Sequence, residues 1–208
     1  MLNVKWLFFD IGETLVDESE CYNHRIRDII AGTKITFDEF YDKVVFFAHT
    51  HYVPVREAIV YFGLPPLKTP WHIEDERLYP NAAEILDYLS GRGYKLGVIA
   101  NQSAGTAERL ANRNLLRYFS TVVASAEEGV AKPDPEIFRR ALERAGCKPE
   151  NAVMIGDRPD NDIFPAKRVG MKTVRILQGF SAYLSPENEE YMADYTVGEL
   201  SELRALFS

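Results

Sequence analysis

The sequence predicts an α/β fold, in which a doubly wound, Rossmann-like parallel sheet carries a small inserted helical domain. From about residue 80 onward, short apolar runs alternate with amphipathic helical patterns. Such alternation favours parallel strands joined by right-handed crossovers, with helices on both faces of the sheet. Residues 17–79 break this rhythm, because they contain helical patterns and no run typical of a main-sheet strand.

The first predicted strand covers residues 4–9, an apolar and aromatic run that ends at Asp10. After the insertion, a helix begins near Pro80 and glycines end it before the strand at 94–100. The remaining predicted elements alternate in the same way: a helix over 106–114, a strand over 121–125, a helix over 134–146, a strand over 152–155, a helix ending near Gly170, a strand over 172–176 and a terminal amphipathic segment with Leu200, Leu203 and Leu206.

The insertion shows two helical signals of its own. Thr36 and Glu39 have the spacing of a capping box, which predicts a helix that begins there. Pro54 is placed to open a further helix, and Gly63 to end it. We therefore expect a helical cap domain between the first and second core strands.

These patterns predict the domain boundaries. Residues 1–16 and 80–208 are expected to form the core, and residues 17–79 the cap. The Pro-rich stretch 63–70 is the best candidate for a linker.

Composition and charge narrow the classes of function. The net charge of −7, without a cluster of Lys and Arg, argues against nucleic acid as a partner. No apolar run approaches the ~18–20 residues that cross a bilayer, and the N-terminal stretch lacks the cleavage site of a secretory signal. Cys21 and Cys147 are far apart and have no metal-like spacing, so we expect reduced thiols in a cytoplasmic protein. Because the charge disfavours nucleic acid, we expect the partner to be a small molecule.

Polar side chains follow three of the predicted strands. Asp10 follows the first, residues 101–103 the second, and the acidic stretch 156–162 a later one, while Lys132 precedes a helix. Because the carboxyl ends of parallel strands meet at one edge of a sheet, these groups are expected to converge there. Carboxylates beside a lysine suit a hard cation such as Mg²⁺ and an anionic substrate, which favours metal-assisted phosphoryl chemistry.

In these motifs the chain resembles the haloacid dehalogenase-like hydrolase superfamily, in the subgroup with a helical (C1-type) cap. The resemblance rests on Asp10 after the first strand, "KPDPEIF" from Lys132, and "GDRPDND" from Gly156, and it covers nearly all of the core. It implies that Asp10 is a nucleophile that forms an aspartyl intermediate and that Lys132 steadies it. It also implies that Mg²⁺ is bound by Asp10, Asp157, Asp162 and the backbone carbonyl of Gly12.

Two positions depart from the family pattern. Gly12 stands where most phosphatases of the family have a second Asp, which protonates the leaving oxygen and later activates water. Glu13 is a candidate substitute, but adjacent side chains of an extended segment point in opposite directions, so Glu13 would need a reshaped loop. Ala100 stands where the family has Ser or Thr, and the predicted substrate-binding donors in its place are Asn101, Gln102 and Ser103.

These departures leave alternatives open. Dehalogenases and phosphonatases of the family also lack the second Asp, but dehalogenases need no metal, and phosphonatases use a cap lysine, for which the cap offers Lys34, Lys43 and Lys68. A binding protein with weak turnover is the alternative from another class. The predicted function is a Mg²⁺-dependent phosphatase that acts on a small phosphorylated molecule.

Overall fold

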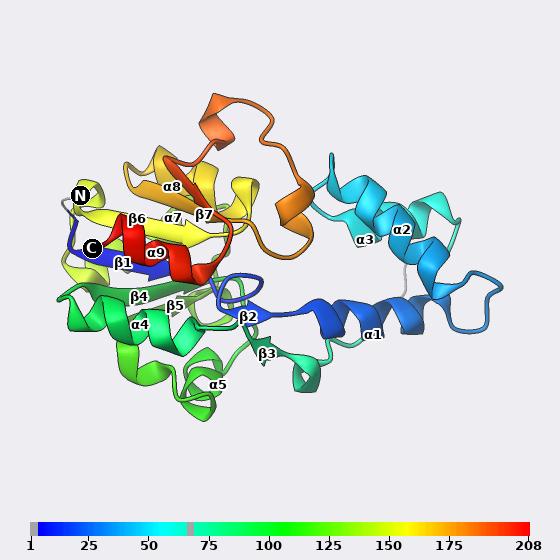
Figure 1. The fold of residues 1–208 in the computed structure, drawn as a ribbon, viewed down its shortest axis with the longest axis horizontal. Helices are drawn as coiled ribbons and strands as arrows, with labels where there is room; N and C mark the ends of the chain where they lie inside the picture. The colour runs from blue at the N-terminus through cyan, green and yellow to red at the C-terminus, as the bar shows by residue number, and fades with distance from the viewer. Residues whose placement is uncertain (1–3, 66–68) are drawn as a thin grey trace.

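A six-stranded parallel sheet forms the centre of the larger part of the molecule (Figure 1). The computed structural model describes residues 4–65 and 69–208, so Lys68 and part of the predicted linker 63–70 lie outside the described residues. The strand order is β5-β4-β1-β6-β7-β8. The strands are β1 (Trp6–Phe9), β4 (Lys95–Ala100), β5 (Phe119–Ala124), β6 (Ala152–Gly156), β7 (Lys172–Ile176) and β8 (Tyr195–Val197).

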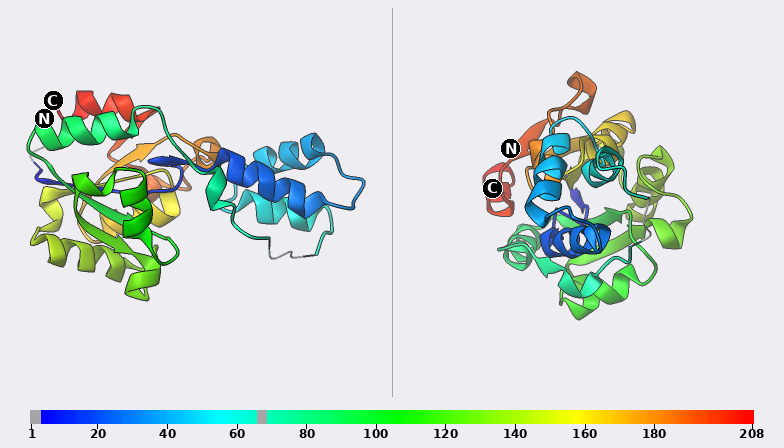
Figure 2. Two further views of the ribbon diagram at one scale, coloured as in Figure 1. Left: turned by 90° about the horizontal axis from the view of Figure 1, so that it is seen from below. Right: turned by 90° about the vertical axis from the view of Figure 1, so that its right-hand side faces the viewer.

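Helices cover both faces of this sheet (Figures 1 and 2). Side chains of β1 alternate between the two faces, because successive residues of a strand point in opposite directions. Leu7 and Phe9 pack in a core with α4 (Ala82–Gly91), α5 (Thr106–Asn112) and α9 (Leu203–Leu206). Trp6 and Phe8 pack in a second core with α7 (Pro135–Ala145) and α8 (Phe164–Arg168). The predicted doubly wound α/β architecture is confirmed.

The chain order of the strands places the ligand edge next to β1. From β1 the chain fills the sheet outward through β4 and β5, and then returns to β6 on the other side of β1. In sheets of this kind, ligands bind beyond the carboxyl ends of the strands at the point where the order reverses. That point lies between β1 and β6, which pair in parallel from Trp6 with Ala152 to Phe9 with Ile155.

Three helices form a bundle beyond this edge of the sheet (Figure 2). They are α1 (Ser19–Ile30), α2 (Phe37–Ala48) and α3 (Pro54–Tyr61). The bundle has its own apolar core, made by Ile26, Ile29, Phe40, Val44, Val55 and Ala58. The predicted capping box is present, because the Thr36 side chain accepts a hydrogen bond from the Glu39 backbone N–H and the Glu39 side chain accepts one from the Thr36 backbone N–H. α3 ends at Tyr61, and Gly63 follows it with a φ of 62°.

The short elements β2, β3, β8 and α6 were not predicted. An antiparallel pair, β2 (Val16–Asp17) with β3 (Arg77–Leu78), joins the bundle to the sheet. The sixth strand, β8, has three residues of which two are exposed, so it lacks the apolar run that identifies a buried strand. The four-residue helix α6 (Ser125–Glu128) follows β5 directly. Within the described ranges, no helix has both the length and the apolar character required to cross a membrane.

Candidate active site

The acidic centre lies where β1 and β6 end. The backbone N–H of Asp10 donates to the carbonyl of Ile155 at 2.9 Å, which holds the two strand ends side by side. Asp157 follows β6 directly, and Asp162 lies in the π-helical turn Pro159–Ile163. Carboxylate oxygens of Asp10, Asp157 and Asp162 lie within 4.8 Å of one another. The sequence prediction that these three residues converge is therefore correct.

Lys132 supplies the positive charge of this centre. Its Nζ lies 2.7 Å from Asp10 Oδ1 and 2.6 Å from Asp162 Oδ1, and its side chain is buried. Burial alone would lower the pKa of Lys132, but the carboxylates of Asp10 and Asp162 raise it above its usual value. The ammonium group is therefore charged at neutral pH, and it orients Asp10.

Tight packing after β6 positions Asp162. A Cβ atom on Gly156 would collide with the Asp162 carboxyl group, so the glycine allows this carboxyl to pack against the backbone. Asp162 Oδ2 also accepts a hydrogen bond from the backbone N–H of Arg158 at 3.0 Å. Both oxygens of Asp162 thus have a protein partner. Burial raises the pKa of Asp162 to about 6, and the ammonium of Lys132 opposes this rise.

Asp157 has less positive charge around it. Its Oδ2 accepts a hydrogen bond from Ser181 Oγ at 2.6 Å. Burial raises the pKa of Asp157 well above its usual value, and the nearby carboxylates of Asp162 and Asp10 raise it further. Lys132 contacts only two of the three carboxylates at this centre, and the uncompensated negative charge makes them suitable ligands for a divalent cation.

The donor set fits Mg²⁺. All of the converging groups are hard oxygen donors, and no described cysteine or histidine belongs to this cluster. Carboxylate oxygens of Asp10, Asp157 and Asp162 lie close enough together to hold one ion, although Asp10 and Asp162 also contact Lys132. Magnesium binding by Asp10, Asp157, Asp162 and the Gly12 carbonyl stays a prediction.

The segment after β4 meets Lys132. Asn101 Nδ2 donates to the carbonyl of Lys132, and the backbone N–H of Lys132 donates to Asn101 Oδ1, both at 2.8 Å. This pair of bonds fixes the loop that carries Lys132. Asn101 and Gln102 line a small cavity together with Asp10 and Lys132. Ser103 is exposed and is not among the residues that line the described cavities. Substrate binding by Asn101, Gln102 and Ser103 stays a prediction.

The loop after Asp10 has an unusual shape. Glu13 has a φ of 51°, in the left-handed region, so the loop is not simply extended. A reshaped loop of this kind is what Glu13 would need in order to act in place of the missing Asp at position 12. However, the buried Glu13 carboxyl accepts a hydrogen bond from the hydroxyl of Tyr79 and packs against Gly179. Burial raises the pKa of Glu13 to about 7.

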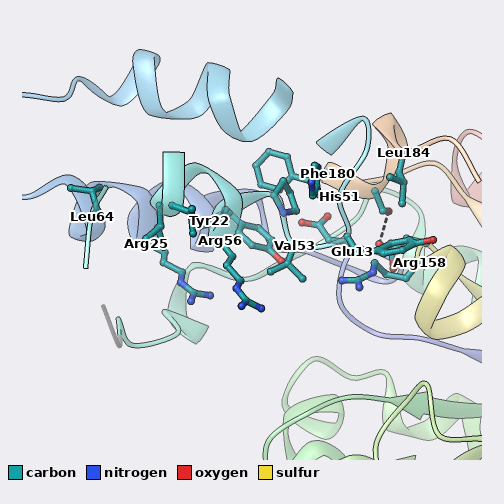
Figure 3. Close-up of a pocket in the computed structure, with 17 residues that line it drawn as sticks. Glu13, Tyr22, Arg25, His51, Val53, Arg56, Leu64, Arg158, Phe180 and Leu184 are labelled. Carbon is teal, nitrogen blue, oxygen red and sulfur yellow. Dashed lines mark hydrogen bonds between the residues drawn. The ribbon is translucent and has the colours of Figure 1, made fainter. Parts of the chain in front are cut away.

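Two cavities meet at the acidic centre. The smaller one, about 150 Å³, has Asp10, Gly12, Lys132 and Asp157 in its wall. The larger one, about 550 Å³, lies between the sheet edge and the helical bundle (Figure 3). Asp157 and Arg158 line both cavities, so a ligand can reach from the acidic centre into the larger space.

Five residues that were not predicted from the sequence also line these cavities: Glu18, Tyr22, Arg158, Phe180 and Ser181. Phe180 packs against Tyr22 of α1 and Tyr41 of α2, with ring centroids 5.2 Å and 5.8 Å apart. Burial and the neighbouring carboxylates raise the pKa of Glu18 to about 9. No spacing rule identifies Glu18, Tyr22, Phe180 and Ser181, because they lie outside the recognisable motifs, whereas Arg158 lies within the acidic motif from Gly156.

Taken together, the parallel sheet, the acid and lysine centre at its switch point and the helical bundle above it define an α/β protein with a covered candidate active site. A family model for haloacid dehalogenase-like hydrolases matches residues 4–170. The chain belongs to this family and is a hydrolase.

Individual relatives agree with this assignment. The chain is 34% identical to a glyceraldehyde 3-phosphate phosphatase of Methanocaldococcus jannaschii, over 96% of this chain and 95% of the relative. It is 38% identical to a phosphoserine phosphatase of Thermus thermophilus, over 61% of this chain and 49% of the relative. A phosphatase structure from Thermococcus onnurineus superposes with a TM-score of 0.66 at 26% identity, covering 98% of this chain and 97% of that one.

Proposed function

We propose that this hydrolase is a Mg²⁺-dependent phosphatase that removes a phosphoryl group from a small molecule through an aspartyl-phosphate at Asp10. The observation that carries the proposal is the 2.7 Å contact between Lys132 Nζ and Asp10 Oδ1 beside two further buried carboxylates. An oriented carboxylate at the mouth of a cavity can attack phosphorus and divide a difficult transfer into two easier steps. The phosphatase names of the two relatives support the same reaction.

Each group at the centre then has a distinct task. Asp10 forms the bond to phosphorus through its free carboxylate oxygen, while Lys132 holds the other oxygen and offsets charge on the phosphoryl group. Asn101 keeps Lys132 in place through its two bonds to the Lys132 backbone. Bound Mg²⁺, held by Asp10 and Asp157, would neutralise charge that develops on the phosphoryl oxygens.

The helical bundle has the position of a cap. We propose that residues 17–79 form a cap domain over a core made by residues 1–16 and 80–208, and that the larger cavity between them receives the leaving group. Covering the site in this way excludes water before the phosphoryl group is transferred.

Hydrolysis assays with an aryl phosphate and an acyl phosphate, with and without Mg²⁺, test the proposal. The expected result is phosphate release that requires Mg²⁺ and disappears in the Asp10→Asn variant. Asp87→Asn is the matched control, because it is the same substitution at an exposed position of α4, outside the candidate active site. Wild-type turnover by Asp10→Asn would contradict Asp10 as the nucleophile.

A second candidate is a protein that binds phosphate and turns it over poorly. The observation that favours it is the loss of two functional side chains, at Gly12 and Ala100. Titration with beryllium fluoride and Mg²⁺, set beside a broad screen of phosphate esters, separates the two candidates. Tight binding of the phosphate mimic without hydrolysis of any ester would support the binding protein.

A further inference from the structure

The space next to Gly12 is filled by the carboxyl group of Glu18. A Cβ atom built on Gly12 would lie 2.5 Å from Glu18 Oε1 and 2.9 Å from Glu18 Cδ. The Glu18 carboxyl therefore occupies the volume into which a side chain at position 12 would extend. Position 12 is where a carboxylate is expected from the family pattern, so a carboxyl group is present there although it comes from another residue.

The local fold explains how Glu18 reaches this place. The chain turns back after Gly12, with Gly12 bridged to Val16, and Glu18 stands directly before α1. A residue at this position commonly caps the helix with its side chain, but the Glu18 side chain makes no such bond. The neighbouring Asp17 accepts the hydrogen bond from the Ser19 backbone N–H at 2.9 Å instead. The Glu18 carboxyl is thus available to turn toward Gly12.

Glu18 also faces the reacting groups. It lines the same small cavity as Asp10 and Lys132, and therefore has access to a phosphoryl group attached to Asp10. On the basis of the proposed phosphatase function, we propose that the Glu18 carboxyl is the proton donor to the leaving group and the proton acceptor for the hydrolytic water.

The two steps balance as follows. In the first, Asp10 attacks phosphorus, the bond between phosphorus and the leaving oxygen breaks, and the Glu18 carboxyl gives its proton to that oxygen, which leaves as an alcohol. In the second, water attacks phosphorus, its proton passes to the Glu18 carboxylate, and the bond between Asp10 and phosphorus breaks. Phosphate leaves, and both side chains return to their starting states.

The other acidic residues near this position have different partners. Glu13 also lines the small cavity, but its carboxyl group accepts a hydrogen bond from Tyr79 and packs against Gly179. Glu76 is paired with Arg113, with Arg113 Nη2 2.5 Å from Glu76 Oε2. Glu18 is therefore the carboxyl group whose position matches the missing side chain.

The first test compares leaving groups in the Glu18→Gln variant. A proton donor matters most when the leaving oxygen is strongly basic, so we expect kcat/KM for an alkyl phosphate to fall by ~10²–10⁴-fold. For 4-nitrophenyl phosphate, whose leaving group needs no proton, kcat/KM should fall by less than about tenfold. Glu20→Gln is the matched control, because Glu20 is an exposed carboxylate two residues further along the chain, in the first turn of α1.

A loss that is equal for both leaving groups would overturn the proposal, because it would indicate a structural role for Glu18. So would full activity of Glu18→Gln on the alkyl ester. The Asp10→Asn variant distinguishes failure of the Glu18 proposal from failure of the proposed phosphatase function. If the phosphatase function is wrong, Asp10→Asn does not lower hydrolysis of any substrate.

The second test moves the carboxyl group back to position 12. Gly12→Asp alone places a second carboxyl group against that of Glu18, so one of the two side chains has to move. Combined with Glu18→Ser, it should recover alkyl phosphate hydrolysis to at least tenfold above Glu18→Ser alone, since the carboxyl group then returns to the same volume. A double variant that is folded by circular dichroism, and no more active than Glu18→Ser, would count against the proposal.

Discussion

The buried ammonium group of Lys132 holds the carboxylates of Asp10 and Asp162 together. Its Nζ lies within 2.7 Å of oxygens of both Asp10 and Asp162. Replacing Lys132 with Met would leave these carboxylates close together without their cation, and removal of one partner from a buried pair costs about 3–5 kcal/mol. We therefore expect Lys132→Met to lower the free energy of unfolding by about 3 kcal/mol in metal-free buffer, measured by urea denaturation, and to abolish hydrolysis.

The exposed Lys34→Met variant controls for the change of side chain in this experiment. Mg²⁺ should restore part of the stability of Lys132→Met, because it supplies positive charge to the same carboxylates. Unchanged stability of Lys132→Met without metal would show that the pair is not needed to hold the site together.

His72 gives the folded protein a second charge-dependent contact. Its Nε2 lies 2.9 Å from Asp28 Oδ2 and its Nδ1 lies 3.1 Å from Glu74 Oε1. Hydrogen bonds to Asp28 and Glu74 raise the pKa of His72. The proton binds His72 more tightly in the folded state, so protonated His72 stabilises the fold. This stabilisation is fully present below the unfolded pKa of about 6.5 and is lost as the pH rises through the higher folded pKa.

We expect the melting temperature of His72→Gln to fall less than that of the wild type between pH 6 and pH 8.5, a range that spans the titration of His72. The measurement is thermal unfolding followed by circular dichroism. His49→Gln is the control, because His49 is exposed and has no described ion pair. If both variants follow the wild-type curve, the contacts of His72 do not contribute to stability.

The sequence identifies some residues of the site and not others, for a physical reason. Asp10, Lys132 and Asp157 lie in compact motifs at strand and helix ends, so their convergence follows from the parallel sheet. Glu18 could not be identified, because its role depends on the shape of the turn after Asp10 and on a side chain that reaches back across it.

The helices α1 and α3 carry charge to the larger cavity. Arg25 of α1 and Arg56 of α3 both line it, and their side chains point the same way in Figure 3. Arg25 Nε donates to Thr69 Oγ1 at 3.0 Å, which fixes its guanidinium group. Apolar residues such as Val53 and Leu64 line the same cavity. These walls suit a leaving group that has an apolar part and a second negative charge.

We expect a phosphate ester with a terminal carboxylate to have a kcat/KM about fivefold to tenfold above that of its neutral amide analogue, because a partly exposed ion pair contributes about 1 kcal/mol. The Arg25→Gln and Arg56→Gln variants should lose this preference and retain their activity on phenyl phosphate. Arg27→Gln, an exposed position of α1, is the control. A preference that survives in both variants would place the anion elsewhere.

Elements differ in how well their patterns predict them. β7 was predicted with its observed bounds, and the capping box at Thr36 marked the start of α2 correctly. β8 was missed because an edge strand needs apolar residues on one face only, and Tyr195 and Thr196 are exposed. The β2–β3 pair was missed because two-residue strands have no periodicity to detect.

At the scale of the whole molecule, the sheet and the helical bundle are linked at more than one place. The chain enters and leaves the bundle through β2 and β3, which pair with each other. In addition, Phe180 of the sheet part packs against aromatic residues of α1 and α2. Three carboxylates meet at the ends of β1 and β6, and Lys132 contacts two of them, Asp10 and Asp162. Burial raises the pKa of Asp157 and Asp162 there, because it disfavours their charged forms.

A cation that binds only the folded centre must therefore stabilise the whole chain. A ligand at a concentration one hundred times its Kd adds about 2.7 kcal/mol to the free energy of unfolding. For a chain of this size that corresponds to a rise of roughly 5–10 °C in melting temperature, which calorimetry with EDTA and then with saturating Mg²⁺ measures directly. The Asp157→Asn variant should lose most of this rise, because it removes a ligand, whereas Asp87→Asn should keep it. An equal rise in Asp157→Asn would mean that Mg²⁺ binds outside the acidic centre, and the assignment of Asp157 as a ligand would then be wrong.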